Sequence, residues 1–266
     1  MFLTVDGAEV YAYVGARKLE TALPTVIFVH GAANDHSVWA LQSRYFAHHG
    51  ANVLAVDLPA HGRSGGVALG SIEALADWIP RVLDAAQVDR ASVVGHSMGS
   101  LATLACAGRH PERVSKIALI GPAVPMPVSD TLLAAAKEDD HVAFELINGW
   151  SFSAGKHLGG NQVPGMWMTG TALRLMERTL PGVLHTDLLA CCGYASGLEA
   201  ASCIRCPALV ILGARDIMAP NRNARALIER LADKRVVTLP DAGHALMAEE
   251  PDYVLDALRE FLKLCS

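Results

Sequence analysis

The chain has few charged residues and no long apolar run, and both absences narrow the kinds of partner it can bind. Charged residues make up 18% of the 266 positions, the formal net charge is −5, and lysine and arginine form no blocks. Nucleic acids and anionic membrane surfaces attract proteins through basic patches, which this sequence lacks. No segment approaches the roughly 20 consecutive apolar residues of a membrane-spanning helix. A small, roughly neutral molecule is therefore the expected partner, with no nucleic acid and no membrane.

A targeting segment and a disulfide framework are also missing. The opening stretch MFLTVDGAEV has no basic n-region, and Asp6 and Glu9 interrupt its apolar residues, so no signal peptide is expected. The six cysteines are too few for a disulfide scaffold at this length, so reduced thiols in a cytoplasmic protein are expected. They are Cys106, Cys191, Cys192, Cys203, Cys206 and Cys265. One C-x-x-C pair is present, but no second pair completes a zinc site, and no metal is expected.

Short apolar runs alternate with longer helical patterns along most of the chain. Six such runs, nearly continuous in apolar residues, are typical of strands buried on both faces of a parallel sheet. They cover residues 25–30, 52–57, 91–96, 116–121, 208–213 and 235–240. The first 14 residues instead predict two antiparallel strands that turn at Asp6-Gly7. The sequence thus predicts an α/β fold whose ligands bind beyond the carboxyl ends of the strands.

This alternation stops between residues 125 and 204. A structureless loop of such length is improbable in a compact domain, so the stretch is predicted to be a helical lid. The chain then divides into a first core segment, 1–124, the lid, 125–204, and a second core segment, 205–266. Large apolar side chains of the lid are predicted to contact the substrate, namely Trp150, Phe152, Met166, Trp167 and Met168.

The stretch GHSMG places Ser97 between two glycines, where a predicted strand gives way to a predicted helix. A serine at such a sharp turn has a strained backbone and an exposed hydroxyl, as a nucleophile requires. Side chains at Gly95 and Gly99 would collide where strand and helix cross. An ordinary βα turn with glycines on both sides of a serine would have the same pattern.

A serine hydroxyl needs a base to take its proton, and the base needs an anion to orient it. Asp216 and His244 each follow a later predicted strand, so Ser97, Asp216 and His244 come from the ends of three strands. Asp241 is the second choice for the acid. His96 is expected to point into helix packing rather than into the site.

Asp57, His61 and Arg63 also follow a predicted strand and could be catalytic. A turn held by proline and glycine and tied by a local carboxylate bond explains them equally, and we favour the turn.

Ester hydrolysis builds negative charge on the carbonyl oxygen, which backbone N–H donors can stabilise. Met98, the residue after the serine, is predicted to supply one donor. The second is expected from HGAAND, where Ala32 is preferred over Ala33.

Five stretches, in this order and spacing, resemble the α/β-hydrolase superfamily: FVHGAAND, VDLPAHGRS, VVGHSMGS, VILGARD and DAGHALMAEEP. The resemblance covers nearly the whole chain except the lid. It implies a mostly parallel eight-stranded sheet flanked by helices, a Ser97/His244/Asp216 triad, an oxyanion hole from Ala32 and Met98, and no cofactor. A serine nucleophile differs from the aspartate of haloalkane dehalogenases and epoxide hydrolases.

The leading prediction is a carboxylesterase-like serine hydrolase that cleaves an ester or thioester of a small, largely apolar substrate through an acyl-enzyme. The alternatives are a C–C bond hydrolase or an acyltransferase on the same triad, or a small-ligand receptor without turnover. The sequence does not predict an oligomeric state.

Overall fold

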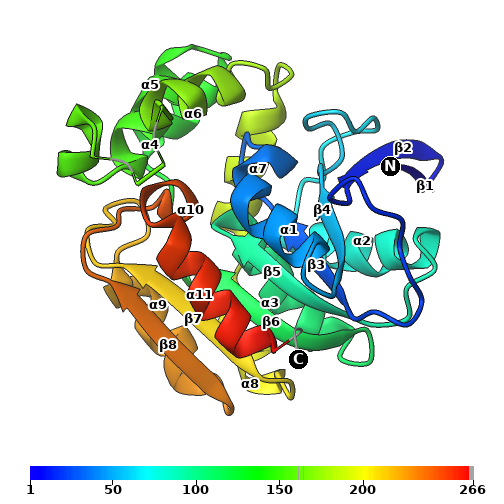
Figure 1. Ribbon diagram of the computed structural model, residues 1–266. Helices are drawn as coiled ribbons and strands as arrows, with labels where there is room; N and C mark the ends of the chain where they lie inside the picture. The colour runs from blue at the N-terminus through cyan, green and yellow to red at the C-terminus, as the bar shows by residue number, and fades with distance from the viewer. Residues whose placement is uncertain (161, 164, 264–266) are drawn as a thin grey trace.

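The computed structural model describes residues 1–160, 162–163 and 165–263, and an eight-stranded sheet runs through these residues (Figure 1). Its strand order is β1-β2-β4-β3-β5-β6-β7-β8; neighbours from β4 to β8 are parallel, whereas β1-β2 and β2-β4 are antiparallel. The strands are β1 Phe2–Val5, β2 Ala8–Tyr13, β3 Thr25–Val29, β4 Asn52–Val56, β5 Ala91–His96, β6 Val114–Ile120, β7 Ala208–Gly213 and β8 Lys234–Leu239.

The predicted strands are confirmed, with ends that shift by no more than two residues. The expected hairpin also forms at the N-terminus, where Asp6 and Gly7 both have positive φ, 52° and 79°. Such left-handed pairs match the twist of the strands that they join. Five of the six cysteines are free thiols, and Cys265 lies outside the described residues.

Helices cover both faces of the sheet because alternate side chains of each central strand point to opposite sides. In β3, Ile27 and Val29 pack into one apolar core, and Val26 and Phe28 pack into the other. The first core is covered by α2 Ile72–Ala85, α3 Met98–Arg109, α8 Gly197–Cys203 and α9 Asn221–Arg230. The second is covered by η1 His36–Trp39, α1 Ala40–Ala47, α10 Leu246–Glu249 and α11 Pro251–Leu262 (Figure 1).

Strand β8 corrects one expectation. The run 235–240 was expected to be buried on both faces, but β8 pairs only with β7 and forms the edge of the sheet. Val236 is consequently 42% exposed. An apolar sequence cannot by itself separate an edge strand from a central one, because the difference depends on which strands pair.

Helices also form in the stretch expected to be the lid, between β6 and β7. They are α4 Asp130–Lys137, α5 Val142–Ser151, η2 Ala154–Leu158, α6 Met168–Met176 and α7 Val183–Gly193, followed by α8. Helices α4 to α7 share an apolar core of their own, which also takes in Ala33 from the loop after β3. Helix α8 instead packs against α3 and α9 beside the sheet. The boundaries at residues 125 and 204 remain predictions.

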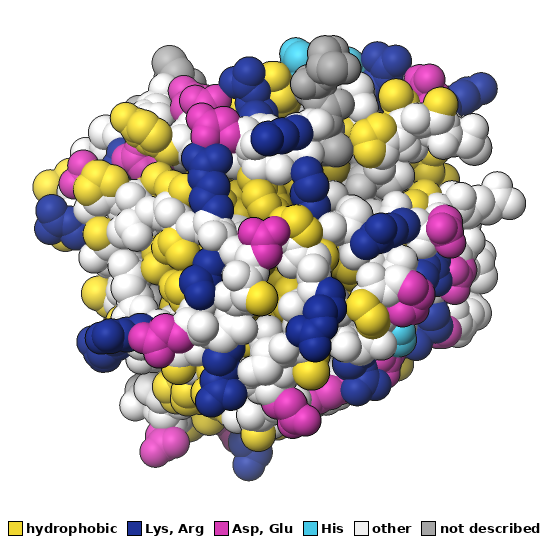
Figure 2. Space-filling view, turned by 90° about the horizontal axis from the view of Figure 1, so that it is seen from below, with side chains coloured by type: hydrophobic (Ala, Val, Ile, Leu, Met, Phe, Trp, Pro, Cys, Tyr) yellow, Lys and Arg dark blue, Asp and Glu magenta, His cyan; other side chains and the backbone are white. Residues whose placement is uncertain are grey.

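The surface carries charges of both signs. On the face shown in Figure 2, basic and acidic side chains lie interspersed among apolar and neutral ones. Within the described residues, no helix is both long and apolar enough to cross a membrane.

Candidate active site

Ser97 lies at the sharp turn between β5 and α3 and has an unusual backbone conformation, with φ 53° and ψ −119°. The strand and the helix cross so closely that a Cβ atom at Gly95 would collide with the carbonyl oxygen of Gly99. A Cβ atom at Gly99 would collide with the carbonyl oxygen of Val29. The expected reason for both glycines is therefore confirmed. The Ser97 N–H donates to the Ile120 carbonyl at 2.9 Å, which fastens this strained turn to the next strand.

Asp216 and His244, from the loops after β7 and β8, form a buried pair. His244 Nδ1 lies 2.7 Å from Asp216 Oδ2. The other carboxylate oxygen accepts the backbone N–H groups of Met218 and Ala219 at 2.9 and 2.8 Å. Burial alone raises the pKa of Asp216, but the charge of His244 and these hydrogen bonds outweigh it, so this pKa lies below its ordinary value. An ionised Asp216 requires the proton on His244 Nδ1, which leaves Nε2 able to accept one.

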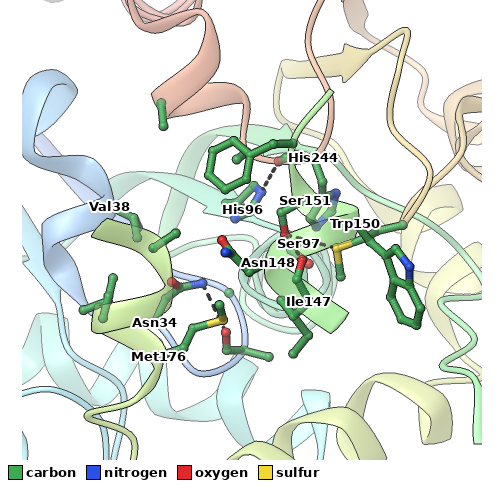
Figure 3. A pocket seen from close by; sticks show the side chains of 18 of the residues that line it. Asn34, Val38, His96, Ser97, Ile147, Asn148, Trp150, Ser151, Met176 and His244 are labelled. Atoms are coloured by element: carbon green, nitrogen blue, oxygen red, sulfur yellow. Dashed lines mark hydrogen bonds between the residues drawn. The ribbon is translucent and has the colours of Figure 1, made fainter. Parts of the chain in front are cut away.

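Ser97 and His244 both line one cavity (Figure 3). In the described part of the chain, no hydrogen bond joins the Ser97 hydroxyl to His244 Nε2. Catalytic hydrogen bonds are often long in enzymes without substrate and shorten when the substrate binds. The structure thus brings the two side chains to the same cavity in an unbonded arrangement.

His96 differs from the expectation that it points into helix packing. Its Nε2 donates to the His244 carbonyl at 2.9 Å, its ring packs against the His244 ring, and it lines the cavity (Figure 3). Burial, with the nearby charge of His244, lowers the pKa of His96 to about 3. His96 is therefore a neutral donor that supports the loop of His244. Its place immediately before Ser97, at the carboxyl end of β5, was the available sequence signal.

The two N–H groups predicted to form an oxyanion hole come from different parts of the chain. Met98 begins α3 behind Ser97, and Ala32 lines the cavity in the loop after β3. The N–H of Ala33 is occupied, because it donates to Asp187 Oδ2 at 3.0 Å. Neither Ala32 N–H nor Met98 N–H has a hydrogen-bond partner among the described residues. These contacts favour Ala32 over Ala33 as the donor.

The competing acidic residues have other surroundings. Asp241 has a side chain that is 71% exposed and lies near Arg215 rather than His244. Asp57 accepts the backbone N–H groups of His36 and Arg63, which matches the expected turn. With Asp35 and His36, Asp57 forms a cluster compact enough to hold a cation. Hydrogen bonds from the protein already occupy oxygens of both carboxylates there.

The cavity has a volume of about 490 Å³, and no Asp, Glu, Lys or Arg is found among its described lining residues. Trp150, Phe152, Met166 and Met168, which were predicted to contact the substrate, line it. Sequence reasoning missed four further methionines, which come from separate segments and share no pattern: Met126, Met176, Met218 and Met247. A wall of flexible, polarizable side chains suits apolar groups of varied shape.

The prediction for Trp167 is corrected. Its side chain does not line the cavity and is 72% exposed. The indole instead lies against Gly170, where a Cβ atom would collide with the ring. The next residue, Met168, begins α6, is buried and lines the cavity.

Asn148 adds a polar group to this apolar wall. It belongs to α5 and lines the cavity (Figure 3), and its buried Oδ1 has no hydrogen-bond partner among the described residues. An unpaired buried amide oxygen is costly unless a bound molecule or water donates to it.

Comparison with known proteins identifies a matching family and several similar proteins. A family model for the alpha/beta hydrolase fold matches residues 24–251. A pimeloyl-(acyl-carrier protein) methyl ester esterase from Chromobacterium violaceum is 30% identical over 90% of this chain and 94% of its own length. The dihydrolipoyllysine-residue acetyltransferase component of an acetoin cleaving system from Pseudomonas putida is 25% identical over 90% of this chain, which spans 63% of that protein. Among solved structures, the enol-lactonase from Burkholderia xenovorans LB400 matches with a TM-score of 0.87 and 25% identity, over 99% of this chain and 100% of that one.

Proposed function

Because the chain belongs to the alpha/beta hydrolase fold family, we propose that it is a serine hydrolase that cleaves a carboxylic ester or thioester through an acyl-enzyme. The observation that carries the proposal is the buried His244–Asp216 pair, at 2.7 Å, whose histidine lines the same cavity as Ser97. The names of two relatives, a methyl ester esterase and an enol-lactonase, support an ester of oxygen.

In the proposed reaction, Ser97 Oγ attacks the carbonyl carbon while His244 Nε2 takes the hydroxyl proton. The carbonyl oxygen becomes an oxyanion, held by the N–H groups of Ala32 and Met98. The tetrahedral intermediate collapses, the bond to the leaving group breaks, and His244 returns the proton to the departing alcohol or thiol. A water molecule then attacks the acyl-enzyme by the same steps and releases the acid. Asp216 stays ionised and holds the ring of His244.

The lining of the cavity supports a neutral substrate with a medium-length or aromatic group. Each buried methylene contributes roughly 0.8 kcal/mol, whereas an isolated charge is strongly disfavoured in such surroundings. The segment from α4 to α7 serves as the lid, and its helices and loops supply Trp150, Phe152, Met166 and Met168. The unpaired amide of Asn148 favours one neutral hydrogen-bonding group, such as a hydroxyl, on the bound molecule.

The proposal is tested by steady-state hydrolysis of p-nitrophenyl acetate, butyrate and octanoate. Wild-type protein should turn over many equivalents of ester and prefer the longer chains. Ser97→Ala should lower kcat by roughly four to six orders of magnitude, because the nucleophile is lost. Ser92→Ala is the matched control and should leave kcat unchanged, because this buried serine lies near the start of β5, at the opposite end of the strand from Ser97, where it contacts Ser115 of β6. Binding without turnover by the wild type, or Ser97→Ala activity within tenfold, would contradict the proposal.

A further inference from the structure

One residue of the loop after β3 is enclosed by the helical segment α4–α7. Ala33 has a positive φ of 53°, which disfavours residues other than glycine. Its N–H donates to Asp187 Oδ2 at 3.0 Å, and its carbonyl accepts the Thr179 hydroxyl at 3.3 Å. Its methyl group is buried in the apolar core of these helices. Contacts from the lid therefore hold a strained residue directly beside Ala32.

Asp187, on α7, is itself held by a buried partner. His61 Nε2 lies 2.9 Å from Asp187 Oδ2, and His61 Nδ1 lies 2.9 Å from the Pro59 carbonyl. Both ring nitrogens face acceptors, so both hydrogen bonds form only in the doubly protonated imidazolium. Burial lowers the pKa of His61, but Asp187 acts in the opposite direction and the net shift is upward. The result is an ion pair, with side chains 3% and 2% exposed, that joins α7 to the loop after β4.

The loop of His244 is joined to the same helical segment. The backbone N–H groups of His244 and Ala245 donate to the Ser151 carbonyl, at the end of α5, at 2.7 and 2.9 Å. The carboxylate of the fully buried Glu249 accepts the N–H groups of Ser153 and Gly243, both at 2.9 Å. The segment thus contacts the loops on both sides of Ser97 by directed hydrogen bonds as well as by apolar packing.

We propose that Asp187 is a positioning residue, through which the lid fixes the backbone of Ala33 and thereby aims the N–H of Ala32, the residue before it, at the oxyanion. This inference rests on the proposed serine hydrolase function. Asp187 touches no reacting atom. Without its carboxylate, Ala33 has no partner for its N–H and can leave the left-handed conformation. The backbone rotation passes through Ala32 to the Gly31–Ala32 peptide, which carries the Ala32 N–H, and this donor is removed from the site although Ser97, His244 and Asp216 are intact.

The test compares Asp187→Ala and Asp187→Asn with wild type, using kcat and KM for p-nitrophenyl butyrate at a temperature where all variants are folded. Removal of one oxyanion donor lowers kcat by roughly 10²- to 10³-fold, and we expect a loss of this order for Asp187→Ala with little change in KM. Asp187→Asn keeps an oxygen that can accept the Ala33 N–H, so it should recover most of that loss.

Hydrogen exchange of the peptide that covers residues 31–36 provides a readout that does not depend on catalysis. Asp187→Ala should raise exchange at Ala33 and Asn34. Asp77→Ala is the matched control, since Asp77 also accepts from a histidine and is paired with Arg109, but it belongs to α2 and contacts the end of α3. It should leave both kcat and exchange at 31–36 unchanged. A kcat within threefold of wild type for Asp187→Ala, or equal losses for the Ala and Asn variants, would overturn the positioning role. Absence of turnover by the wild type would instead count against the proposed function.

Discussion

At the scale of the single residue, Asp216 is bound on both of its carboxylate oxygens. One oxygen faces His244, and the other accepts the N–H groups of Met218 and Ala219. An amide in this place can keep the backbone hydrogen bonds, but it directs an NH₂ group toward His244 and so favours the wrong tautomer of the ring.

We therefore expect Asp216→Asn to lower kcat by roughly 10⁴-fold with the fold retained. The matched control is Asp241→Asn, because the exposed Asp241 follows the next strand and is paired with Arg215. Its kcat in the same ester assay should be close to that of the wild type. If Asp216→Asn kept the wild-type kcat and Asp241→Asn lost it, Asp241 would be the acid instead.

His96 gives a second residue-scale prediction, on stability against pH. Its pKa is about 3 in the folded protein, against an ordinary value of 6.5. Between these two values the unfolded chain binds a proton that the folded protein does not, so stability falls as the pH falls. At pH 5 this costs roughly 2 kcal/mol relative to pH 7.5.

His96→Gln should remove this part of the acid sensitivity while it keeps a donor for the His244 carbonyl. Urea unfolding at pH 5 and pH 7.5 measures the effect, and the wild type should lose about 2 kcal/mol more than the variant. His30, whose pKa is lowered to about 4, is present in both proteins and so does not contribute to the difference. Equal losses in the two proteins would mean that His96 is protonated when folded.

The residues that sequence reasoning could assign are those whose place follows from a strand end. Ser97, Asp216 and His244 were predicted in this way, and the structure brings them to one cavity or into direct contact. Asp187 and His61 lie 126 positions apart, and nothing in the spacing of either suggests that they pair. The unpaired amide of Asn148 could not be predicted either, because the lack of a hydrogen-bond partner depends on the residues that surround it in the fold.

At the scale of the element, the position of each strand in the sequence was easier to predict than the strands with which it pairs. Runs of apolar residues, many of them β-branched, predicted the bounds of β3 to β7 to within two residues. Burial on both faces of the sheet requires an apolar residue at nearly every position of such strands. The exposed edge of β8 depends on pairing, which a run of residues does not encode. Between β6 and β7 the helices were expected, but the sequence did not show which of their side chains face the cavity. The prediction for Trp167 was wrong for that reason.

The segment from α4 to α7 gives an element-scale prediction about the length of the substrate's acyl chain. Alanine substitutions at Trp150, Phe152, Met166 and Met168, one at a time, remove apolar surface inside the cavity. The ratio of kcat/KM for p-nitrophenyl octanoate to that for the acetate should change in at least one variant, by roughly fourfold for each substrate methylene that is no longer buried. Activity on the acetate should persist.

Trp167→Ala is the matched control for this series, because its indole is exposed outside the cavity. Its chain-length profile should equal that of the wild type. Identical profiles for all four cavity variants, each shown to be folded, would contradict the role of the lid in substrate choice.

At the scale of the whole molecule, the sheet gathers the proposed catalytic loops at one end, and the helices α4 to α6 lie over that end (Figure 1). The order β4-β3-β5-β6-β7-β8 places the loops after β3, β5, β7 and β8 near each other although they span more than 200 positions of the chain. Parallel strands present their carboxyl ends on the same side, so this gathering follows from the βαβ connections.

The uncharged wall of the cavity also bears on how the proposed reaction ends. Hydrolysis turns a neutral ester into an alcohol and an acid, and the acid ionises in water at neutral pH. A carboxylate is poorly solvated among methionine and leucine side chains with no cation among the described lining residues. The ionised product therefore gains free energy by leaving for bulk water, while the neutral alcohol does not. Accumulated alcohol should compete with fresh ester for the enzyme, and accumulated acid should not.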